Sequence, residues 1–208
     1  MNFAEYNVKD ANFEEILLAL KSLDTVEAVA LGGSRSTGAS DENSDYDIYV
    51  YCAEIPTAET RENLLEKYCS IAEFGNHYWE SEDNTVMNNG VPVDIIYREV
   101  DRFGRYIDTV IKGGKAFNGY TTAFWHNIKN SKVLFDKTGT FTKFRDMAQI
   151  DFPENLRSAI IKNNRNLLNG KLPSYDKQIK KAQERGDIVS VNHRITAVSY
   201  THLRAHET

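Results

Sequence analysis

The chain has 208 residues, with 25 Lys and Arg against 30 Asp and Glu, five His and two Cys. At roughly 100–200 residues per domain, this length predicts one domain with at most a smaller appendage. Its apolar fraction of 41% excludes a wholly disordered chain. No apolar run reaches the roughly 20 residues of a membrane span, and two cysteines are too few for a disulfide framework or a four-ligand zinc site. We therefore expect a soluble, cytoplasmic protein without a membrane partner.

The charge is divided unevenly along the chain. Residues 1–100 contain 6 Lys and Arg against 20 Asp and Glu, whereas residues 101–197 contain 18 against 9. An acidic half suits metal cations and a basic half suits phosphate groups. The alternative, two solvated faces of opposite sign, stays open at this point.

Apolar spacing predicts an alternation of helices and strands, followed by helices alone. The amino-terminal part is predicted to contain a helix over 12–23, a buried strand over 26–31, a short helix over 34–40, a strand over 46–52, a helix over 57–71, short strands over 77–80 and 85–88 with a turn over 81–84, and a strand over 91–97. The rest is predicted to contain helices over 99–112 and 123–129, a strand or turn over 132–136, and helices over 153–168, 175–185 and from 188. This order predicts the α/β (α+β) class: a mixed sheet flanked by helices, then a helical C-terminal region.

We predict three parts along the chain: a core domain over 1–148, a helical C-terminal region over 149–197, and a non-native tail over 198–208. The tail, VSYTHLRAHET, has neither helical nor strand periodicity and resembles the translation of a sequencing-library adapter. We therefore expect the native chain to continue past Ala197 and the helical region to be truncated.

The segment LGGSRSTGASDENSDYDIYV, residues 31–50, contains the first candidate site. Gly32, Gly33 and Ser34 follow a predicted buried strand and precede a predicted helix. Glycines allow the backbone to approach a ligand closely, and free N–H groups at a helix start bind phosphate oxygens. Many strand-to-helix turns are rich in glycine, so this signal is weak by itself.

The second candidate site is formed by acids within apolar strands. Asp45 and Asp47 point to the same face of a strand, and Asp94 lies in the apolar segment VPVDIIY. Oxygen ligands in this arrangement suit Mg²⁺ or Mn²⁺, and three acids on two neighbouring strands allow a two-metal site. The other interpretation, two edge-strand acids and a hydrogen-bonded Asp94 at a strand end, stays open from spacing alone.

Aromatic residues and single histidines surround these segments without forming a motif. We expect them to pack in the core or along a cleft rather than to act in catalysis, with stacking on a base or an acceptor as the alternative. They are His77, Trp79, Tyr120, Phe124, Trp125 and His126.

Together these motifs resemble the DNA polymerase β-type nucleotidyltransferase superfamily. Gly33 and Ser34 are followed after roughly ten residues by Asp45-Tyr46-Asp47, with Asp94 as a later third acid. The match is closest to small bacterial nucleotidyltransferase-domain proteins related to antibiotic adenylyltransferases. GGSRSTG resembles the variant of the pattern that has an arginine after the serine.

The resemblance implies a role for each motif residue. Asp45 and Asp47 would hold two Mg²⁺ ions, with Mn²⁺ as an alternative, and Asp94 would hold the catalytic ion and help to deprotonate the acceptor. Gly33 and Ser34 would bind the β- and γ-phosphates of the nucleotide. Arg35 would neutralise triphosphate charge, or instead pair with one of the acids at positions 41 and 42.

The implied enzyme belongs to the 2.7.7 type of transferases: it would move a nucleoside monophosphate, AMP from ATP, to an acceptor hydroxyl and release pyrophosphate. We expect a small-molecule acceptor, and nucleic acid is the least favoured partner. Two alternatives stay open. One is an antitoxin-like protein that transfers AMP to a protein partner; the other is a nucleotide-sensing or toxin-binding module without catalysis.

Overall fold

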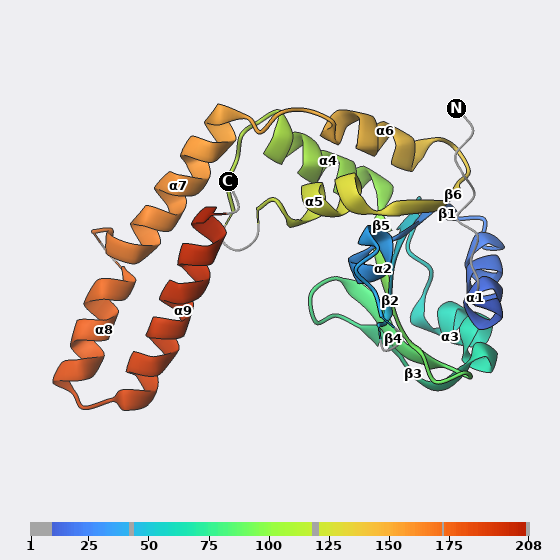
Figure 1. Cartoon of the computed structure of the whole chain (residues 1–208), viewed down its shortest axis with the longest axis horizontal. Helices are drawn as coiled ribbons and strands as arrows, with labels where there is room; N and C mark the ends of the chain where they lie inside the picture. The colour runs from blue at the N-terminus through green and yellow to red at the C-terminus, as the bar shows by residue number, and fades with distance from the viewer. Residues whose placement is uncertain (1–9, 42–43, 118–120, 172, 207–208) are drawn as a thin grey trace. The chain divides into compact units, whose positions relative to one another are not determined.

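A computed structural model describes residues 10–41, 44–117, 121–171 and 173–206, and for residues 201–206 the course of the backbone alone (Figure 1). The chain forms two compact units, residues 1–105 with 126–149 and residues 106–125 with 150–208. Helices α4 (Val100–Ile111) and α5 (Ala123–Asn130) each have residues in both units. Among the described helices, none is both long and apolar enough to cross a membrane.

The first unit is built on a sheet in the order β3-β4-β5-β2-β1-β6. Its strands are β1 (Val26–Leu31), β2 (Tyr46–Cys52), β3 (Cys69–Asn76), β4 (Ser81–Met87), β5 (Pro92–Glu99) and β6 (Lys132–Asp136). Strands β2 and β5 run parallel, and the other neighbouring pairs described are antiparallel. The predicted mixed sheet flanked by helices is therefore confirmed.

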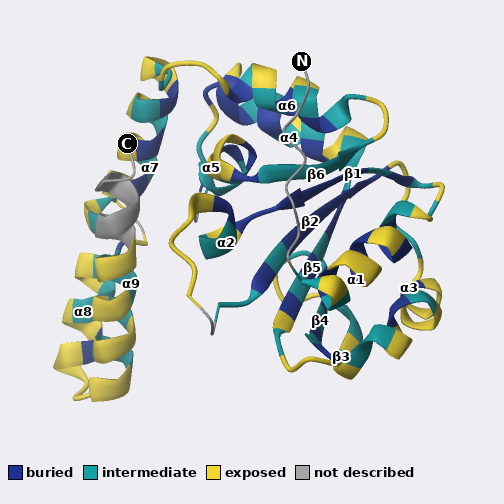
Figure 2. Ribbon diagram, turned by 45° about the vertical axis from the view of Figure 1, so that its right-hand side comes forward, coloured by how far each residue is buried: buried dark blue, intermediate teal, exposed yellow. Residues whose placement is uncertain are grey.

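One face of this sheet is covered by α1 (Ala11–Lys21) and α3 (Ala58–Leu65). The carboxylate of Asp10 begins α1 by accepting hydrogen bonds from the N–H groups of Asn12 and Phe13 at 3.0 and 3.3 Å. Apolar residues at helical spacing on α1 then pack on apolar residues that alternate along the strands. The fully buried members of this core include Phe13, Ile16, Leu20, Val29, Leu31, Ile48, Val50 and Ile95. Figure 2 shows these central strands as the most buried part of the molecule.

On the opposite face of the sheet, aromatic side chains pack over one end. There the ring of Tyr51 makes edge contacts with Phe103 of α4 and Phe141 of α6 (Thr140–Ala148), with ring centroids 5.2 and 5.3 Å apart. Side chains two residues apart on a strand share a face, so Asp47 and Tyr49 lie on the same face as Tyr51. The five-residue helix α2 (Gly33–Thr37) lies beside β2 at the Asp47 end. This end is where the candidate site forms.

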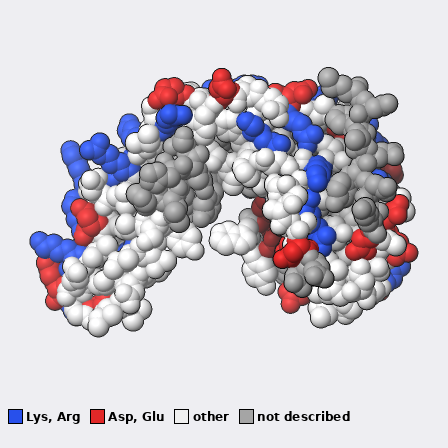
Figure 3. All heavy atoms as spheres, in the orientation of Figure 1, with Lys and Arg blue, Asp and Glu red and all other residues white. Residues whose placement is uncertain are grey.

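The second unit consists of helices α7 (Glu154–Asn169), α8 (Tyr175–Glu184) and α9 (Ile188–His206), with the ends of α4 and α5. The three helices pack against one another, and their buried residues include Leu156, Ile160 and Ala182. The predicted helical C-terminal region is confirmed. Lys and Arg side chains gather over α7 and α8 on the face that Figure 3 shows. Helix α9 includes residues 198–206, although the sequence there lacks helical periodicity; the origin of the tail and the domain boundaries stay predictions.

Three local predictions for residues 57–88 are wrong. The helix expected over 57–71 ends at Leu65, a 3₁₀ turn follows over Glu66–Tyr68, and β3 begins at Cys69. Residues 77–80, expected as a strand, form the turn that joins β3 and β4, and the segment Ser81–Asn84, expected as a turn, is strand. Its polar residues fit a strand because β3 and β5 pair with its backbone on both sides and tertiary partners bind its side chains.

The aromatic residues do not share one environment. Trp125 is 4% exposed, as expected for a packing residue, whereas Trp79 is 93% exposed and His77 and His126 are exposed. The expectation of packing is therefore wrong for these three residues. The turn after β3 and the solvent side of α5 place them outside the core. Tyr120 lies outside the described residues.

Candidate active site

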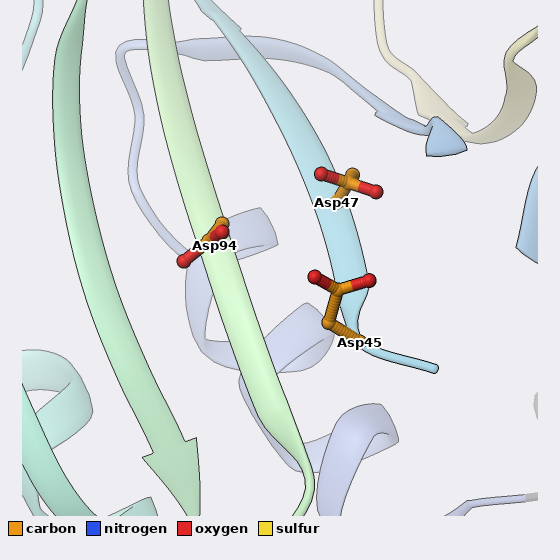
Figure 4. A group of neighbouring side chains, drawn as sticks. All are labelled: Asp45, Asp47 and Asp94. Atoms are coloured by element: carbon orange, nitrogen blue, oxygen red, sulfur yellow. The ribbon is translucent and has the colours of Figure 1, made fainter. Parts of the chain in front are cut away.

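The three acids predicted from the sequence come together on one face of the sheet. The parallel register of β2 and β5 puts Asp47 directly beside Asp94, and Asp45 precedes β2 by one residue. Each residue offers one carboxylate oxygen, and these oxygens all lie within 4.8 Å of one another. Figure 4 shows the three side chains on the same side of the two strands.

The carboxylates of this group form no ion pair within the part of the chain that the structure describes. The pKa of Asp47 is raised from 3.8 to about 6. Burial is the largest cause, and the negative charges of Asp45 and Asp94 contribute the rest. Among the described residues, no Lys or Arg forms an ion pair with any of the three carboxylates. The free energy of this arrangement therefore falls if a cation binds between the oxygens.

A divalent cation that prefers oxygen ligands fits this site. The donor set consists of carboxylates alone, which suits Mg²⁺ or Mn²⁺ and not the nitrogen and sulfur preference of Zn²⁺. Burial and the neighbouring carboxylates raise the pKa of Asp47, and a bound cation would act against this shift by favouring the ionised form. All three acids reach solvent, so an ion has access to them.

The glycine turn lies directly against the acids. Gly33 has a φ of +58°, and a Cβ at this position would lie 1.8 Å from Oδ2 of Asp47, so any other residue would displace that carboxylate. The N–H of Gly32 donates a 2.8 Å hydrogen bond to the carbonyl oxygen of Asp47. The hydroxyl of Ser36 donates to the carbonyl of Gly33 at 2.8 Å and stabilises the turn. Gly33 and the half-buried Ser34 thus lie beside Asp47.

Arg35 contacts the backbone that leads into β2. Its guanidinium donates a 2.9 Å hydrogen bond from Nε to the carbonyl oxygen of Asp45, and further bonds to the carbonyl of Ser44. It also lies 4.0 Å from the centre of the Tyr46 ring. These contacts fix the position of the Asp45 backbone. Glu42, one of the acids expected to pair with Arg35, lies outside the described residues. A role of Arg35 in nucleotide binding stays a prediction.

Two residues near the acids were missed in the sequence. Asn84 donates a 2.9 Å hydrogen bond to Oδ1 of Asp94, and Nζ of Lys132 donates a 3.2 Å bond to the carbonyl of Arg35. The dipeptide Asn89-Gly90 is a signal for a hairpin turn, and a hairpin centred there pairs Asn84 with Asp94. Lys132 had no signal, because its strand is distant in sequence.

The comparisons with known proteins show the family to which the chain belongs. The sequence pattern of the nucleotidyltransferase domain family matches residues 13–117, half of the chain, and this range includes every residue that we predicted for the site. The chain therefore belongs to the nucleotidyltransferase domain family, and the resemblance to the polymerase β-type superfamily is confirmed. No curated protein sequence matches the chain.

Solved structures similar to this chain include a nucleotidyltransferase-like protein from Exiguobacterium sibiricum, with 10% identity and a TM-score of 0.45 over 91% of this chain. This chain covers 53% of that protein, about half of its length. A toxin–antitoxin structure with AMP-PNP has 18% identity and a TM-score of 0.39, covering 72% of this chain and 95% of that one. A CD-NTase from Bradyrhizobium diazoefficiens in complex with GTP has 12% identity and a TM-score of 0.32, covering 93% and 83%. The family assignment rests on the sequence match and not on these structures.

Proposed function

We propose that this chain is a metal-dependent nucleotidyltransferase that transfers AMP from ATP to a hydroxyl group of a small-molecule acceptor. The observation that supports this most directly is the group formed by Asp45, Asp47 and Asp94, whose oxygens lie within 4.8 Å of one another and form no ion pair with any described Lys or Arg. The group lies in a chain whose family transfers nucleotidyl groups. A non-catalytic member has no need to keep three repelling carboxylates together.

In this proposal Asp45 and Asp47 would hold two Mg²⁺ ions, and Asp94 would hold the catalytic ion; Mn²⁺ is the alternative ion. When bound, the ions neutralise triphosphate charge and lower the pKa of the acceptor hydroxyl. Gly33 and the adjacent Ser34 bind the β- and γ-phosphates, since the backbone of Gly33 lies against Asp47. Arg35 keeps Asp45 in place through the two backbone carbonyls that it contacts.

The reaction balances as one in-line displacement. The acceptor oxygen forms a bond to the α-phosphorus, the bond from this phosphorus to the β-phosphate oxygen breaks, and its electron pair leaves with pyrophosphate. Asp94 accepts the hydroxyl proton and passes it to solvent. Positioning and charge neutralisation supply most of the rate in reactions of this kind.

The experiment uses ATP labelled at the α-phosphate, the full chain, and a protein-free extract of small metabolites. We expect label in a small-molecule product, with pyrophosphate release that requires a divalent cation. Asp47→Asn should lower the rate by at least about a thousandfold, since several kcal/mol of charge stabilisation are lost. Asp24→Asn, which removes an exposed acid from a turn of the same unit, should leave the rate unchanged.

Other outcomes contradict parts of the proposal. Turnover of Asp47→Asn at the wild-type rate, or release of pyrophosphate in the presence of a chelator, would refute the assignment of the site. Entry of label into a protein band, with none in small molecules, would favour the protein acceptor of an antitoxin-like enzyme. Faster turnover of another nucleoside triphosphate would refute the choice of ATP alone.

A further inference from the structure

A chain of side-chain hydrogen bonds leads from the β3–β4 hairpin to Asp94. Nδ2 of Asn76 donates to Oδ1 of Asn84 at 2.8 Å, and Nδ2 of Asn84 donates to Oδ1 of Asp94 at 2.9 Å. The two asparagines lie on β3 and β4, whereas Asp94 lies on β5. Three adjacent strands therefore each contribute one member.

The sheet register determines which residue faces Asp94. Asn84 is the direct partner of Asp94 in the antiparallel β4–β5 pair, and directly opposed side chains in such a pair lie on the same face. The turn before β5 contains Gly90 with a φ of +85°, and it closes through a 2.9 Å bond from the N–H of Met87 to the carbonyl of Val91. Because a shift of one residue would move Asn84 to the opposite face, this turn keeps its amide beside Asp94.

Asn76 determines the orientation of the Asn84 amide. An amide has one acceptor end and one donor end. Since the oxygen of Asn84 accepts from Asn76, its NH₂ group is directed to Asp94. An irregularity in the β3–β4 register between Glu73 and Asn76 accompanies this contact, and Asn76 also donates to Oε2 of Glu73 at 3.3 Å.

A neutral donor on Asp94 differs in its consequence from a cation. A carboxylate has about four lone-pair positions, so one amide bond orients the group and leaves positions for a metal ion. A Lys or Arg in the same place would neutralise the charge that attracts the ion. Asn84 therefore restricts the rotation of the Asp94 carboxylate while the net charge of the acids is kept.

We propose that Asn84 is a positioning residue that holds the Asp94 carboxylate in the orientation required for a divalent ion, and that Asn76 keeps the Asn84 amide in its donating orientation. This inference rests on the proposed function, because it assigns Asp94 a metal-holding role. Residues that orient a metal ligand in this way typically contribute tenfold to hundredfold to metal affinity.

The test measures the binding of Mn²⁺ to the full chain by electron paramagnetic resonance, without nucleotide. Asn84→Leu has a similar volume but no donor, and we expect its affinity for Mn²⁺ to be about tenfold to hundredfold lower than that of the wild type. Asn76→Ala should give a smaller loss, roughly twofold to fivefold, because the amide of Asn84 can then rotate. Asn88→Ala removes an exposed amide from the turn between β4 and β5, and this variant should bind Mn²⁺ as the wild type does.

Thermal unfolding of each variant separates positioning from folding. A positioning role predicts that Asn84→Leu keeps its melting temperature and loses Mn²⁺ affinity; affinity within twofold of the wild type would overturn the proposal. If Asn84→Leu does not fold, Asn76→Ala decides, and unchanged affinity in that variant overturns the proposal. A wild-type chain that does not bind Mn²⁺ would instead refute the proposed function, and this result is distinct from equal binding by wild type and variant.

Discussion

Adjacent residues on β4 face opposite sides of the same sheet and meet opposite electrostatic environments. Asp83 points to the α3 side, where Arg61 donates to its carboxylate at 2.9 Å, and both side chains are almost fully buried. Asn84 points to the other side, where it contacts Asp94 in the group of acids that lacks a cation among the described residues. Among the described residues, an arginine pairs with the acid that stabilises the fold, and no Lys or Arg forms an ion pair with the carboxylates that are placed to bind an ion.

A second ion pair joins a buried arginine to a half-buried glutamate. On the same face as the site, Arg98 donates to both carboxylate oxygens of Glu80 at 2.9 and 2.7 Å, and to the hydroxyl of Tyr51 at 3.2 Å. Arg98 lies four residues after Asp94 on β5, so the strand carries a compensated charge at one end and an uncompensated charge at the other. An ion pair suits the end of the strand that aromatic side chains cover. Acids that form no ion pair with a described residue suit the end where an ion has access.

Removal of the arginine from the α3 side should give the largest effect on stability. Arg61→Met leaves Asp83 as a buried charge without a counter-ion, and we expect the free energy of unfolding to fall by about 3–5 kcal/mol in a urea titration. The double variant Arg61→Met with Asp83→Leu should recover most of this loss. Glu62→Ala, an exposed neighbour on α3, should change stability by no more than about 0.5 kcal/mol. A loss below about 1 kcal/mol in Arg61→Met would contradict the structural role of the pair.

Addition of a divalent cation should raise the free energy of unfolding by binding to the group of acids formed by Asp45, Asp47 and Asp94. With Mg²⁺ or Mn²⁺ at a hundredfold excess over its dissociation constant, binding to the folded state adds about 2.7 kcal/mol to the free energy of unfolding. The resulting rise in melting temperature should disappear in Asp47→Asn, because a ligand is lost. Asp24→Asn should keep the rise. Equal rises in wild type and Asp47→Asn would show that the ion binds elsewhere.

The pH dependence of the metal-free chain should give the smallest effect. The folded pKa of Asp47, about 6, lies above its ordinary value of 3.8, so the protonated form favours folding. Stability from this group is therefore present near pH 4, falls as the pH rises through 6, and stays low above that. After allowance for solvent screening, Asp47→Asn should be more stable than the wild type above pH 7 by about 1 kcal/mol, or roughly 2–4 °C in melting temperature.

Melting curves recorded in the presence of a chelator test whether Asp47→Asn is more stable than the wild type above pH 7. The difference between wild type and Asp47→Asn should shrink towards zero near pH 4, where the wild-type carboxyl is protonated. A variant that is less stable than the wild type above pH 7 would mean that the chain itself compensates the charge of Asp47.

Much of the fold could be predicted from the sequence because its core elements have strong periodicity. The helix that contains Phe13, Ile16 and Leu20 and the apolar strands that contain Ile48 and Ile95 were expected close to their observed positions. The β3–β4 hairpin could not be predicted in the same way. Its strands contain polar residues whose partners, such as Arg61 for Asp83, lie on distant elements.

Most residues of the site could also be predicted from the sequence, because they belong to a local motif. Asp45 and Asp47 share a face by strand alternation alone, and the glycine turn precedes them at short range. Asp94 needed the parallel β2–β5 register to reach Asp47, and Asn84 needed the β4–β5 register to reach Asp94. The β2–β5 register depends on a contact between strands that are far apart in sequence, whereas the β4–β5 register follows from the local hairpin at Asn89-Gly90, whose signal was overlooked.

The sequence by itself determined the class of fold, the acids and the family, because alternation, apolar runs and motif spacing are local properties of the chain. Only the tertiary structure decided which charges are compensated. Arg61 and Arg98 lie on the same stretch of chain as the acids, but their spacing does not show that they pair with Asp83 and Glu80. Nor does it show that Asp47 and Asp94 form no ion pair with any described residue. The physical reason is that an electrostatic interaction depends on distance in space and on burial, both of which the sheet register determines.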